Sequence, residues 1–156
     1  MYGSTLGATM RVERLGPGDE DRILRAGHLF DEPPDPSAVR AYLEDPRNIF
    51  LLAYDGETAV GFLRGTELRQ LKTERKQMFL YEIAVDATFR RRGIGRELVR
   101  FLLRDCRIRG YEEVFAVTDP ANHAAVQLYR TTGAVTETPA DRMFVYQLSR
   151  EPDPVR

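Results

Sequence analysis

The amino-acid sequence predicts a mixed α/β domain, in which a central, mostly antiparallel twisted sheet is flanked by about four helices. The first observation is that stretches patterned like strands alternate along the chain with stretches of helical periodicity. The second is Asp55-Gly56, which stands between two apolar runs and is a strong short signal for an antiparallel hairpin. A hairpin in the middle of the chain argues against a purely parallel, doubly wound sheet.

The predicted elements up to residue 85 are separated by clear breaks. Gly16-Pro17-Gly18 ends the first strand, and the three prolines of residues 31–36 exclude regular structure there. Residues 1–9 are interpreted as a flexible leader. The predicted elements are a strand over 10–15, helices over 19–30 and 37–43, and strands over 49–54, 58–67 and 78–85.

A long helix over residues 93–109, ended by Gly110, opens the second half of the chain. Its predicted buried face consists of Ile94, Leu98, Phe101, Leu102 and Ile108. The remaining predictions are a strand over 113–117, a helix over 122–132 and a closing strand over 143–148. A single domain is therefore expected over residues 10–149, followed by a tail over 150–156.

The composition restricts the classes of function. The chain has 156 residues, with 23 Lys+Arg against 24 Asp+Glu, and its formal net charge of −1 argues against a dedicated nucleic-acid binder. No stretch approaches the roughly 20 apolar residues of a membrane-spanning helix, and the first ten residues show no signal peptide. The single cysteine, Cys106, excludes an internal disulfide and favours a reduced, cytoplasmic setting and an inert thiol.

The most informative stretch is the loop Arg90-Arg91-Arg92-Gly93-Ile94-Gly95-Arg96, which joins a strand to the long helix. The first N–H groups of a helix lack internal partners, and the helix dipole adds positive charge there. Glycines let a phosphate approach these groups, and arginines suit its charge. A glycine pair alone is often a packing device and an arginine run a solvated face, but together they favour an anion site. The third glycine of a dinucleotide-binding motif and the ending of a Walker-type loop are missing.

The spacing Arg90-x-x-Gly93-x-Gly95 resembles the signature of the GNAT acyltransferases, and the resemblance extends over about residues 10–149. It implies the GNAT fold, an acetyltransferase activity, and acetyl-CoA as the cosubstrate, with its pyrophosphate held in the loop 90–96. It also implies that the strand end Ile83-Ala84-Val85 pairs its backbone with the pantetheine arm.

A second motif, Asn122-x-x-Ala125-x-x-Leu128-Tyr129, resembles the segment that contacts the cofactor in the family. The resemblance implies that Asn122 and Ala125 lie at the cofactor. It also implies that Tyr129 faces the departing sulfur, where a phenol can act as general acid. Without the resemblance, Tyr129 would be interpreted as core packing on an amphipathic helix.

Glu82 is the best candidate for a base or a substrate anchor. Transfer to an amine requires removal of a proton, and Glu82 is an acid within the otherwise apolar strand that precedes the cofactor loop. The alternative is a cross-strand ion pair on a half-exposed strand. The N–H group of either Ile83 or Val85 is available to polarise the thioester carbonyl. His28 and His123 have no partners at metal-ligand spacing, so no metal is expected.

The charge of the chain is divided unevenly. Residues 1–67 hold twelve acids and seven bases, a net −5, which leaves +4 for residues 68–156. Asp31, Glu32 and Asp35 lie in the proline-rich loop, a region that in the family generally helps to form the acceptor site. Clustered carboxylates attract a cationic amine, although a solvated acidic loop is the alternative. We add Asp119 and Glu82 to this candidate acceptor site.

Within the family, the chain most resembles the gentamicin-type aminoglycoside 3-N-acetyltransferases, through Leu29-Phe30, the strand 79–85 and the Arg-Arg-x-Gly-Ile loop. Those enzymes often carry an acid in the last strand, where this chain has Met143-Phe144-Val145-Tyr146-Gln147-Leu148. The resemblance implies acetyl transfer to a cationic small molecule by direct attack in a ternary complex. Transfer to a protein N-terminus, a lysine or a small metabolite is one alternative, and a CoA-binding regulatory module is another. Family members often form homodimers, which nothing in this chain fixes.

Overall fold

The computed structural model describes residues 9–136 and Phe144. The rest of the predicted closing strand over 143–148, the tail over 150–156 and leader residues 1–8 lie outside the described residues. Thr9, the last residue of the predicted leader, is bonded to the first hairpin, because its hydroxyl donates to Asp55 Oδ1 at 2.7 Å. Among the described helices, none is long and apolar enough to cross a membrane.

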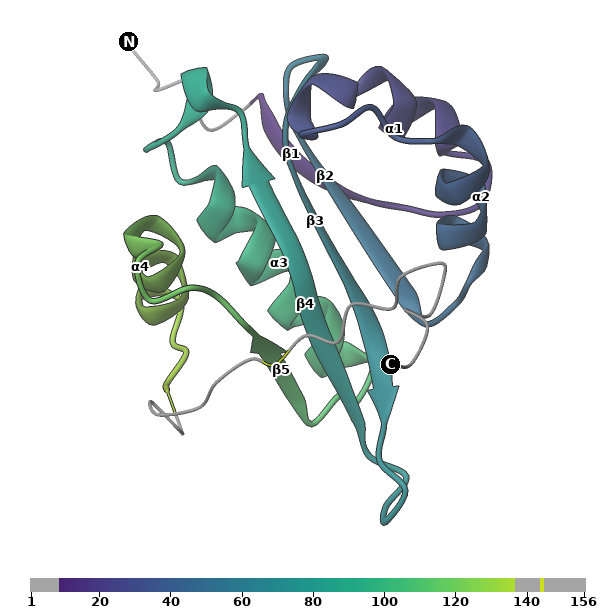
Figure 1. Cartoon of the computed structure of the whole chain (residues 1–156), viewed down its shortest axis with the longest axis vertical. Coiled ribbons are helices and arrows are strands. Elements are labelled where there is room, and N and C mark those ends of the chain that lie inside the picture. The colour runs from purple at the N-terminus through teal and green to yellow at the C-terminus, as the bar shows by residue number, and fades with distance from the viewer. Residues whose placement is uncertain (1–8, 137–143, 145–156) are drawn as a thin grey trace, which may run out of the picture.

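Five strands form one sheet in the order β1-β2-β3-β4-β5 (Figure 1). The first four pair antiparallel with their neighbours in sequence, whereas β5 runs parallel to β4. The strands are β1 Met10–Leu15, β2 Asn48–Asp55, β3 Thr58–Arg69, β4 Lys76–Val85 and β5 Glu113–Ala116. The predicted hairpin at Asp55-Gly56 joins β2 to β3, with Gly56 at φ 58° as a tight turn requires. The predicted mixed, mostly antiparallel sheet is confirmed.

Helices cover both faces of this sheet (Figure 1). The helices are α1 Glu20–Arg25, α2 Pro36–Glu44, α3 Ile94–Ile108 and α4 His123–Thr131, with 3₁₀ turns η1 Gly27–Leu29 and η2 Ala87–Phe89. Leu52 belongs to the core under α1 and α2, whereas its neighbour Leu51 belongs to the core under α3. Because successive strand residues point to opposite faces, the continuous apolar run of β2 serves both cores.

The first predicted helix, over residues 19–30, is too long. In the structure α1 ends at Arg25, and Gly27, a weak helix former, begins the 3₁₀ turn η1. Phe30 is extended and its ring stacks on that of Phe62, with 4.3 Å between the ring centroids. The chain therefore leaves the helical path in order to bury an aromatic ring on the sheet.

The end of the buried face of α3 also differs from the prediction. The predicted positions from Ile94 to Leu102 are buried or half-buried, but Ile108 is 86% exposed. The stripe that faces the sheet continues from Leu102 to Cys106, which lies two residues, or roughly 200° around the helix, from Ile108. Burial raises the pKa of the Cys106 thiol to about 11, so the thiol stays protonated at neutral pH. The prediction that Ile108 is buried is wrong, and Cys106 takes its place.

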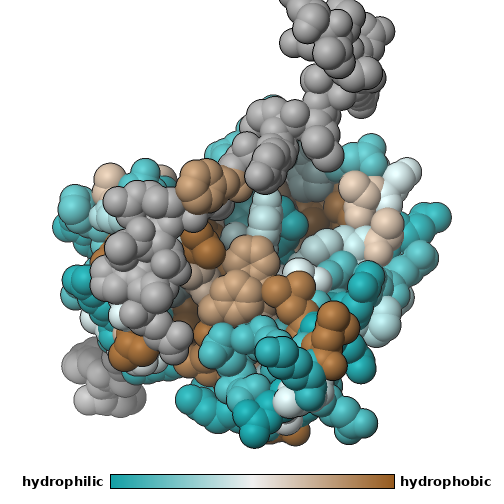
Figure 2. Space-filling view, turned by 60° about the horizontal axis from the view of Figure 1, so that its bottom comes forward, coloured by the Kyte–Doolittle hydropathy of each residue, from teal (hydrophilic) through white to brown (hydrophobic). Residues whose placement is uncertain are grey.

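The surface is mixed rather than uniformly polar. In Figure 2, hydrophobic residues gather in the middle of the visible face and hydrophilic residues border them. The large hydrophobic side chains that are exposed among the described residues are Leu68, Leu71, Tyr81, Ile108, Val117, Val135 and Phe144. One of them, Tyr81, lies in β4 beside the features described next.

Candidate functional site

The last part of β4 has a free edge. β5 pairs with β4 only as far as Leu80, whereas β3 pairs with it as far as Val85, and no other strand of the described residues continues the sheet there. The Asp86 N–H donates to the Val60 carbonyl of β3 at 2.8 Å. Because N–H groups alternate in direction along a strand, those of Ile83 and Val85 point to the free edge. Both N–H groups are thus available to a ligand, and the choice between them stays open.

The anion loop, residues 90–96, has a backbone suited to an anion. Gly93 is the N-cap of α3 with φ 81°, and Arg91 also has a positive φ of 64°. Such reversals make successive N–H groups converge into a concave nest, and the positive end of the helix dipole lies beside it. A Cβ atom at Gly93 would meet no atom within 4 Å. The approach to these N–H groups is therefore open.

The arginines of the anion loop keep their charge available. All four of them are exposed, and the Arg92 guanidinium lies 4.9 Å from the centroid of the Phe89 ring. Within residues 9–136 none of the four takes part in an ion pair, and the ion pairs of α3 begin farther along, at Arg100 with Glu97. The positive field predicted from the sequence is therefore not neutralised by these described neighbours.

Gly95 brings the two sequence motifs together. A Cβ atom on Gly95 would lie 3.3 Å from Leu128 of α4 and 3.8 Å from Val85 of β4. Since 3.3 Å is tighter than ordinary van der Waals contact, only glycine lets α3 approach α4 this closely without a shift. The strand end, the start of α3 and α4 therefore meet at one place.

The predicted cofactor residues of α4 are well defined. Asn122 is the N-cap of the helix, and its Oδ1 accepts the Ala125 N–H at 3.1 Å. This leaves the Nδ2 amide of Asn122 as a donor. Tyr129 is half-buried against the core under α3, and burial raises the pKa of its phenol. A protonated phenol at neutral pH is the form that a general acid needs.

Glu82 lies on the opposite face of β4 from these residues. Ala84 packs against the core under α1 and α2, and the alternation of side chains places Glu82 on the same face. Arg64 of β3 is its direct partner across the strands, and Arg64 Nε donates to Glu82 Oε2 at 2.6 Å. The cross-strand ion pair that the sequence left as the alternative is therefore present.

A β-bulge shapes β4 at this position. Gly65 pairs with Leu80 and Arg64 pairs with Glu82, so Tyr81 is an extra residue on β4. The Arg64 guanidinium lies 4.3 Å from the centroid of the Tyr81 ring. The bulge coincides with the point where β5 stops pairing with β4, so the change of register and the free edge arise together.

Sequence reasoning missed Arg64 and Tyr42. The hydroxyl of Tyr42, on α2, donates toward the carbonyl oxygens of Gly65 at 2.7 Å and Ile49 at 3.0 Å, and burial raises its pKa to about 12. Arg64 follows the apolar run 60–63, and a lone charge in such a strand was the available signal. Its partner could not be identified by counting residues, because the bulge shifts the register by one.

The acidic loop, residues 31–35, starts on the same face as Glu82. Phe30 stacks on Phe62, and Phe62 is the cross-strand neighbour of Ala84 in β4. Asp31 and Glu32 follow directly and are exposed. In the part of the chain that the structure describes, no hydrogen bond or ion pair joins either carboxylate to Glu82. The structure thus places the start of the acidic loop against the sheet. It does not bring the carboxylates of Asp31 and Glu32 into contact with Glu82.

Two other candidate acceptor residues have local roles. Asp35 is the N-cap of α2, and its Oδ2 accepts the Ala38 N–H at 2.9 Å. Asp119 Oδ1 accepts the Ala121 N–H at 2.8 Å in the turn before α4. In each carboxylate, one oxygen therefore already accepts a backbone N–H and organises the local backbone.

Neither histidine belongs to a set of metal ligands. His28 Nε2 lies 2.9 Å from the Ala59 carbonyl oxygen, and His123 is exposed at the start of α4. Among the described residues, no group of three or more His, Cys, Asp or Glu side chains is arranged to hold a metal ion.

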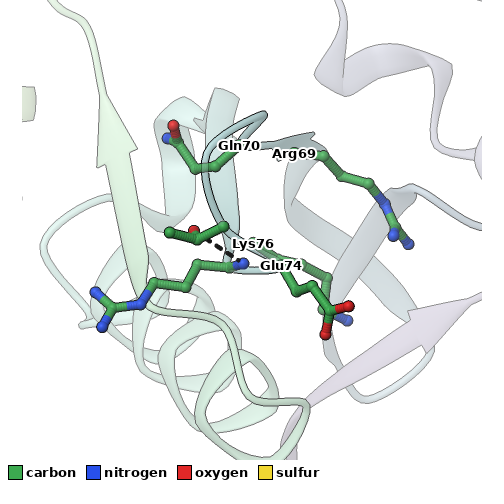
Figure 3. Close-up of a pocket in the computed structure, with 6 residues that line it drawn as sticks. Arg69, Gln70, Glu74 and Lys76 are labelled. Carbon is green, nitrogen blue, oxygen red and sulfur yellow. Dashed lines mark hydrogen bonds between the residues drawn. The ribbon is translucent and has the colours of Figure 1, made fainter.

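A polar hollow lies at the turn between β3 and β4 (Figure 3). Six residues of β4, or about 20 Å of extended strand, separate this turn from Glu82. The hollow is therefore remote from the anion loop and the free edge. Its lining residues are Arg69, Gln70, Thr73, Glu74, Arg75 and Lys76.

The chemistry of these groups fits acetyl-CoA. The open nest at Gly93 and the exposed arginines suit a pyrophosphate. The N–H groups of Ile83 and Val85 suit the amide groups of a pantetheine arm, which can bind a free edge as another strand would.

Comparisons with known proteins support the same interpretation. A model of the acetyltransferase (GNAT) family matches residues 20–134. N-acetyltransferase family 8 member 3 from Rattus norvegicus is 31% identical over 113 residues, which is 72% of this chain and 50% of the relative. The chain thus spans about half the length of this curated relative.

Solved structures share the fold. An aminoglycoside acetyltransferase from an uncultured soil metagenomic sample, in complex with sisomicin, is similar with a TM-score of 0.85 and 25% sequence identity. The similarity covers 92% of this chain and 99% of that chain. An aminoglycoside N-acetyltransferase in complex with CoA has a TM-score of 0.68 at 21% identity, covering 88% and 93% of the two chains, and shows the fold alone. The predicted GNAT fold is confirmed.

Proposed function

The chain belongs to the acetyltransferase (GNAT) family, and from this premise we propose that it is an N-acetyltransferase that acetylates an amine of a cationic small molecule. The 3-amino group of an aminoglycoside is the leading candidate. The observation that carries the proposal is the free edge of β4, which has the anion loop at its end and Glu82 on one face. The similarity to a sisomicin-bound acetyltransferase supports the aminoglycoside class.

The anion loop and the free edge hold the cosubstrate in this proposal. Acetyl-CoA, when bound, supplies the acetyl group as a thioester. The N–H groups around Gly93 and the arginines of the loop bind its phosphates, and Asn122 Nδ2 donates a further hydrogen bond. The N–H of Ile83 or Val85 donates to the carbonyl oxygen of the acetyl group, where negative charge develops during attack.

The two proton transfers fall on opposite faces of β4. Glu82 accepts a proton from the attacking amine, directly or through one water, and Tyr129 Oη donates a proton to the departing sulfur. Glu82 lies on the face of α1 and α2, and Tyr129 lies on the face of α3 and α4. This separation keeps base and acid apart while the amine attacks directly in a ternary complex.

The acceptor binds on the face of α1 and α2 in this proposal. Asp31 and Glu32 are exposed carboxylates beyond the stack of the half-buried Phe30 on Phe62 and attract a polycation over several ångströms. Asp35 adds charge at a position fixed by its capping bond, and Asp119 adds charge in the turn before α4, where it accepts the Ala121 N–H. A peptide acceptor with a single positive charge would make less use of these several carboxylates.

Thiol release with acetyl-CoA and a panel of amines tests the proposed activity. The panel contains sisomicin, a linear polyamine, free lysine and a peptide with a free N-terminus. We expect the highest kcat/KM with sisomicin, and product analysis should place the acetyl group on the 3-amino nitrogen. Turnover only with the peptide or lysine would exclude the aminoglycoside proposal. Calorimetric binding of acetyl-CoA without transfer to any amine would indicate a regulatory module.

Glu82→Gln tests the role of the carboxylate. We expect kcat/KM for the acceptor to fall about 10²-fold, because general-base catalysis contributes about that much, while KM for acetyl-CoA stays within about twofold. Glu74→Gln, an exposed acid at the β3–β4 turn, is the matched control. Equal activity of the two variants would exclude Glu82 as base or anchor.

A further inference from the structure

Arg64 is a charged residue that the proposed chemistry leaves unexplained. It follows the buried residues Phe62 and Leu63 in β3, and its own side chain is 32% exposed. A partly buried guanidinium loses hydration, so it needs partners that restore its interactions. The structure supplies three such partners on one face of the sheet.

The first partner is Glu82, through Nε and Oε2 at 2.6 Å. The other two are aromatic rings, with the guanidinium carbon 4.3 Å from the centroid of Tyr81 and 5.8 Å from that of Tyr42. A planar guanidinium is well suited to contacts of this kind. Its position is therefore set by one neighbouring strand, β4, and one helix, α2.

The β-bulge makes this arrangement possible. Because Tyr81 is the extra residue on β4, Arg64 contacts both Tyr81 and Glu82, although they are adjacent in sequence. The Tyr42 hydroxyl donates to the Gly65 carbonyl, on the residue next to Arg64. Helix α2, the bulge and the guanidinium therefore form one connected unit.

The contact with Arg64 leaves one carboxylate oxygen of Glu82 available to accept a hydrogen bond from a ligand. Oε2 accepts from the guanidinium, and among the described residues no hydrogen bond reaches Oε1. A carboxylate held at one oxygen cannot rotate freely about its last torsion, so the direction of Oε1 is fixed. A fixed acceptor is what the alignment of an attacking amine requires.

We propose that Arg64 is a positioning residue for acetyl transfer, which holds Glu82 so that Oε1 faces the acceptor amine. This proposal rests on the proposed function. A purely structural ion pair is the competing explanation, since cross-strand pairs of opposite charge also stabilise sheets. The two explanations differ in what Arg64→Gln should do, because a structural role predicts a lower Tm with little change in acceptor kinetics, whereas a positioning role predicts a loss of kcat/KM for the acceptor.

The test compares Arg64→Gln, Arg64→Lys and the reversed pair Arg64→Glu with Glu82→Arg. Arg47→Gln is the matched control, because Arg47 is an exposed arginine paired with Asp45 at 2.7 Å. The readouts are kcat and KM for the acceptor, KM for acetyl-CoA, and Tm.

We expect Arg64→Gln to lower kcat/KM for the acceptor about 10-fold to 100-fold, in line with the cost of a misplaced catalytic group, while KM for acetyl-CoA changes less than about twofold. Arg64→Lys should recover part of the loss, because it keeps the charge but not the planar contacts. The reversed pair should restore Tm to within about 4 °C of the wild type but not the activity. Activity of Arg64→Gln equal to that of Arg47→Gln would overturn the proposal. Full activity of the reversed pair, which lacks Glu82, would exclude Glu82 as the base and with it the role of Arg64.

A calorimetric titration with sisomicin, on protein saturated with CoA, separates this proposal from the proposed function. If the wild type transfers acetyl to no amine, the proposed function fails. The role of Arg64 is then tested only by the Kd for sisomicin. A weaker Kd for Arg64→Gln than for Arg47→Gln supports its positioning of Glu82. An equal Kd, or no binding to the wild type, overturns it.

Discussion

The anion loop and the Arg64–Glu82 pair are the two charged regions at the free end of β4, and they are built in different ways. The loop presents exposed arginines around a backbone that Gly93 opens, and it forms no ion pair within the described residues. The acceptor side presents Glu82 already bonded to Arg64, on a strand deformed by a bulge.

Because of this difference, the net charge of a segment does not by itself predict the ligand that the segment binds. The net +4 of residues 68–156 matches a real positive surface, because the arginines of the loop have no acidic neighbours paired with them in the described residues. The net −5 of residues 1–67 is a poor guide to the field at the acceptor, because Asp35 caps α2 and because Glu82, which lies outside that range, is already paired with Arg64. A charge predicts a ligand only where the fold leaves it unpaired.

The largest effect is expected on the cofactor side, from Tyr129→Phe. The variant lacks the proton that the proposal assigns to the departing sulfur, so kcat should fall about 10²-fold with little change in KM for acetyl-CoA. Tyr111→Phe is the control, because Tyr111 is also a tyrosine with a raised pKa but bonds to Glu67 at 2.6 Å. The control should lower Tm without a comparable loss of kcat.

The same residue predicts a pH dependence. The acid form of Tyr129 is the active one, and burial raises the pKa of its phenol above the ordinary value of about 10. Activity should therefore persist as the pH rises to about 10 and be lost only above it, and this alkaline limb should be absent in Tyr129→Phe. An alkaline limb near pH 8 that depends on Tyr129 would contradict the assignment.

A somewhat smaller effect is expected on the acceptor side, from Gly65→Ala. A Cβ atom there would lie 2.6 Å from the Phe79 carbonyl oxygen, so the bulge must shift. We expect a loss of about 2 kcal/mol in the free energy of unfolding and a lower kcat/KM for the acceptor. Gly16→Ala is the control, since a Cβ at Gly16 meets nothing within 4 Å. Equal stability of both variants in urea unfolding would show that the bulge is not rigid.

The smallest effect is expected from Gly93→Ala. The space around a Cβ atom is open, so the cost comes from φ 81° alone, about 1 kcal/mol. If the anion loop works through its backbone, KM for acetyl-CoA should rise about fivefold. Gly18→Ala carries a similar strain at φ 99° and should lower Tm equally without changing that KM. An unchanged KM in Gly93→Ala would place the phosphate contacts on the arginines alone.

Much of the fold could be predicted because its signals are local. The Asp55-Gly56 turn and the start of the long helix at Gly93 each depend on a few neighbouring residues. The errors arose where distant packing decided. Ile108 has the right residue type but the wrong angle around α3, and the first helix ends early because Phe30 reaches Phe62.

The sequence by itself determined the family signature, the mixed sheet and the anion loop, since a helix start, glycines and arginines act through local backbone geometry and charge. Only the tertiary structure decided the partner of Glu82. That partner, Arg64, is set by a bulge at Tyr81, by Gly65 and by the hydroxyl of Tyr42 on α2. Cross-strand register depends on contacts between elements, and a shift of one residue changes every pairing beyond it.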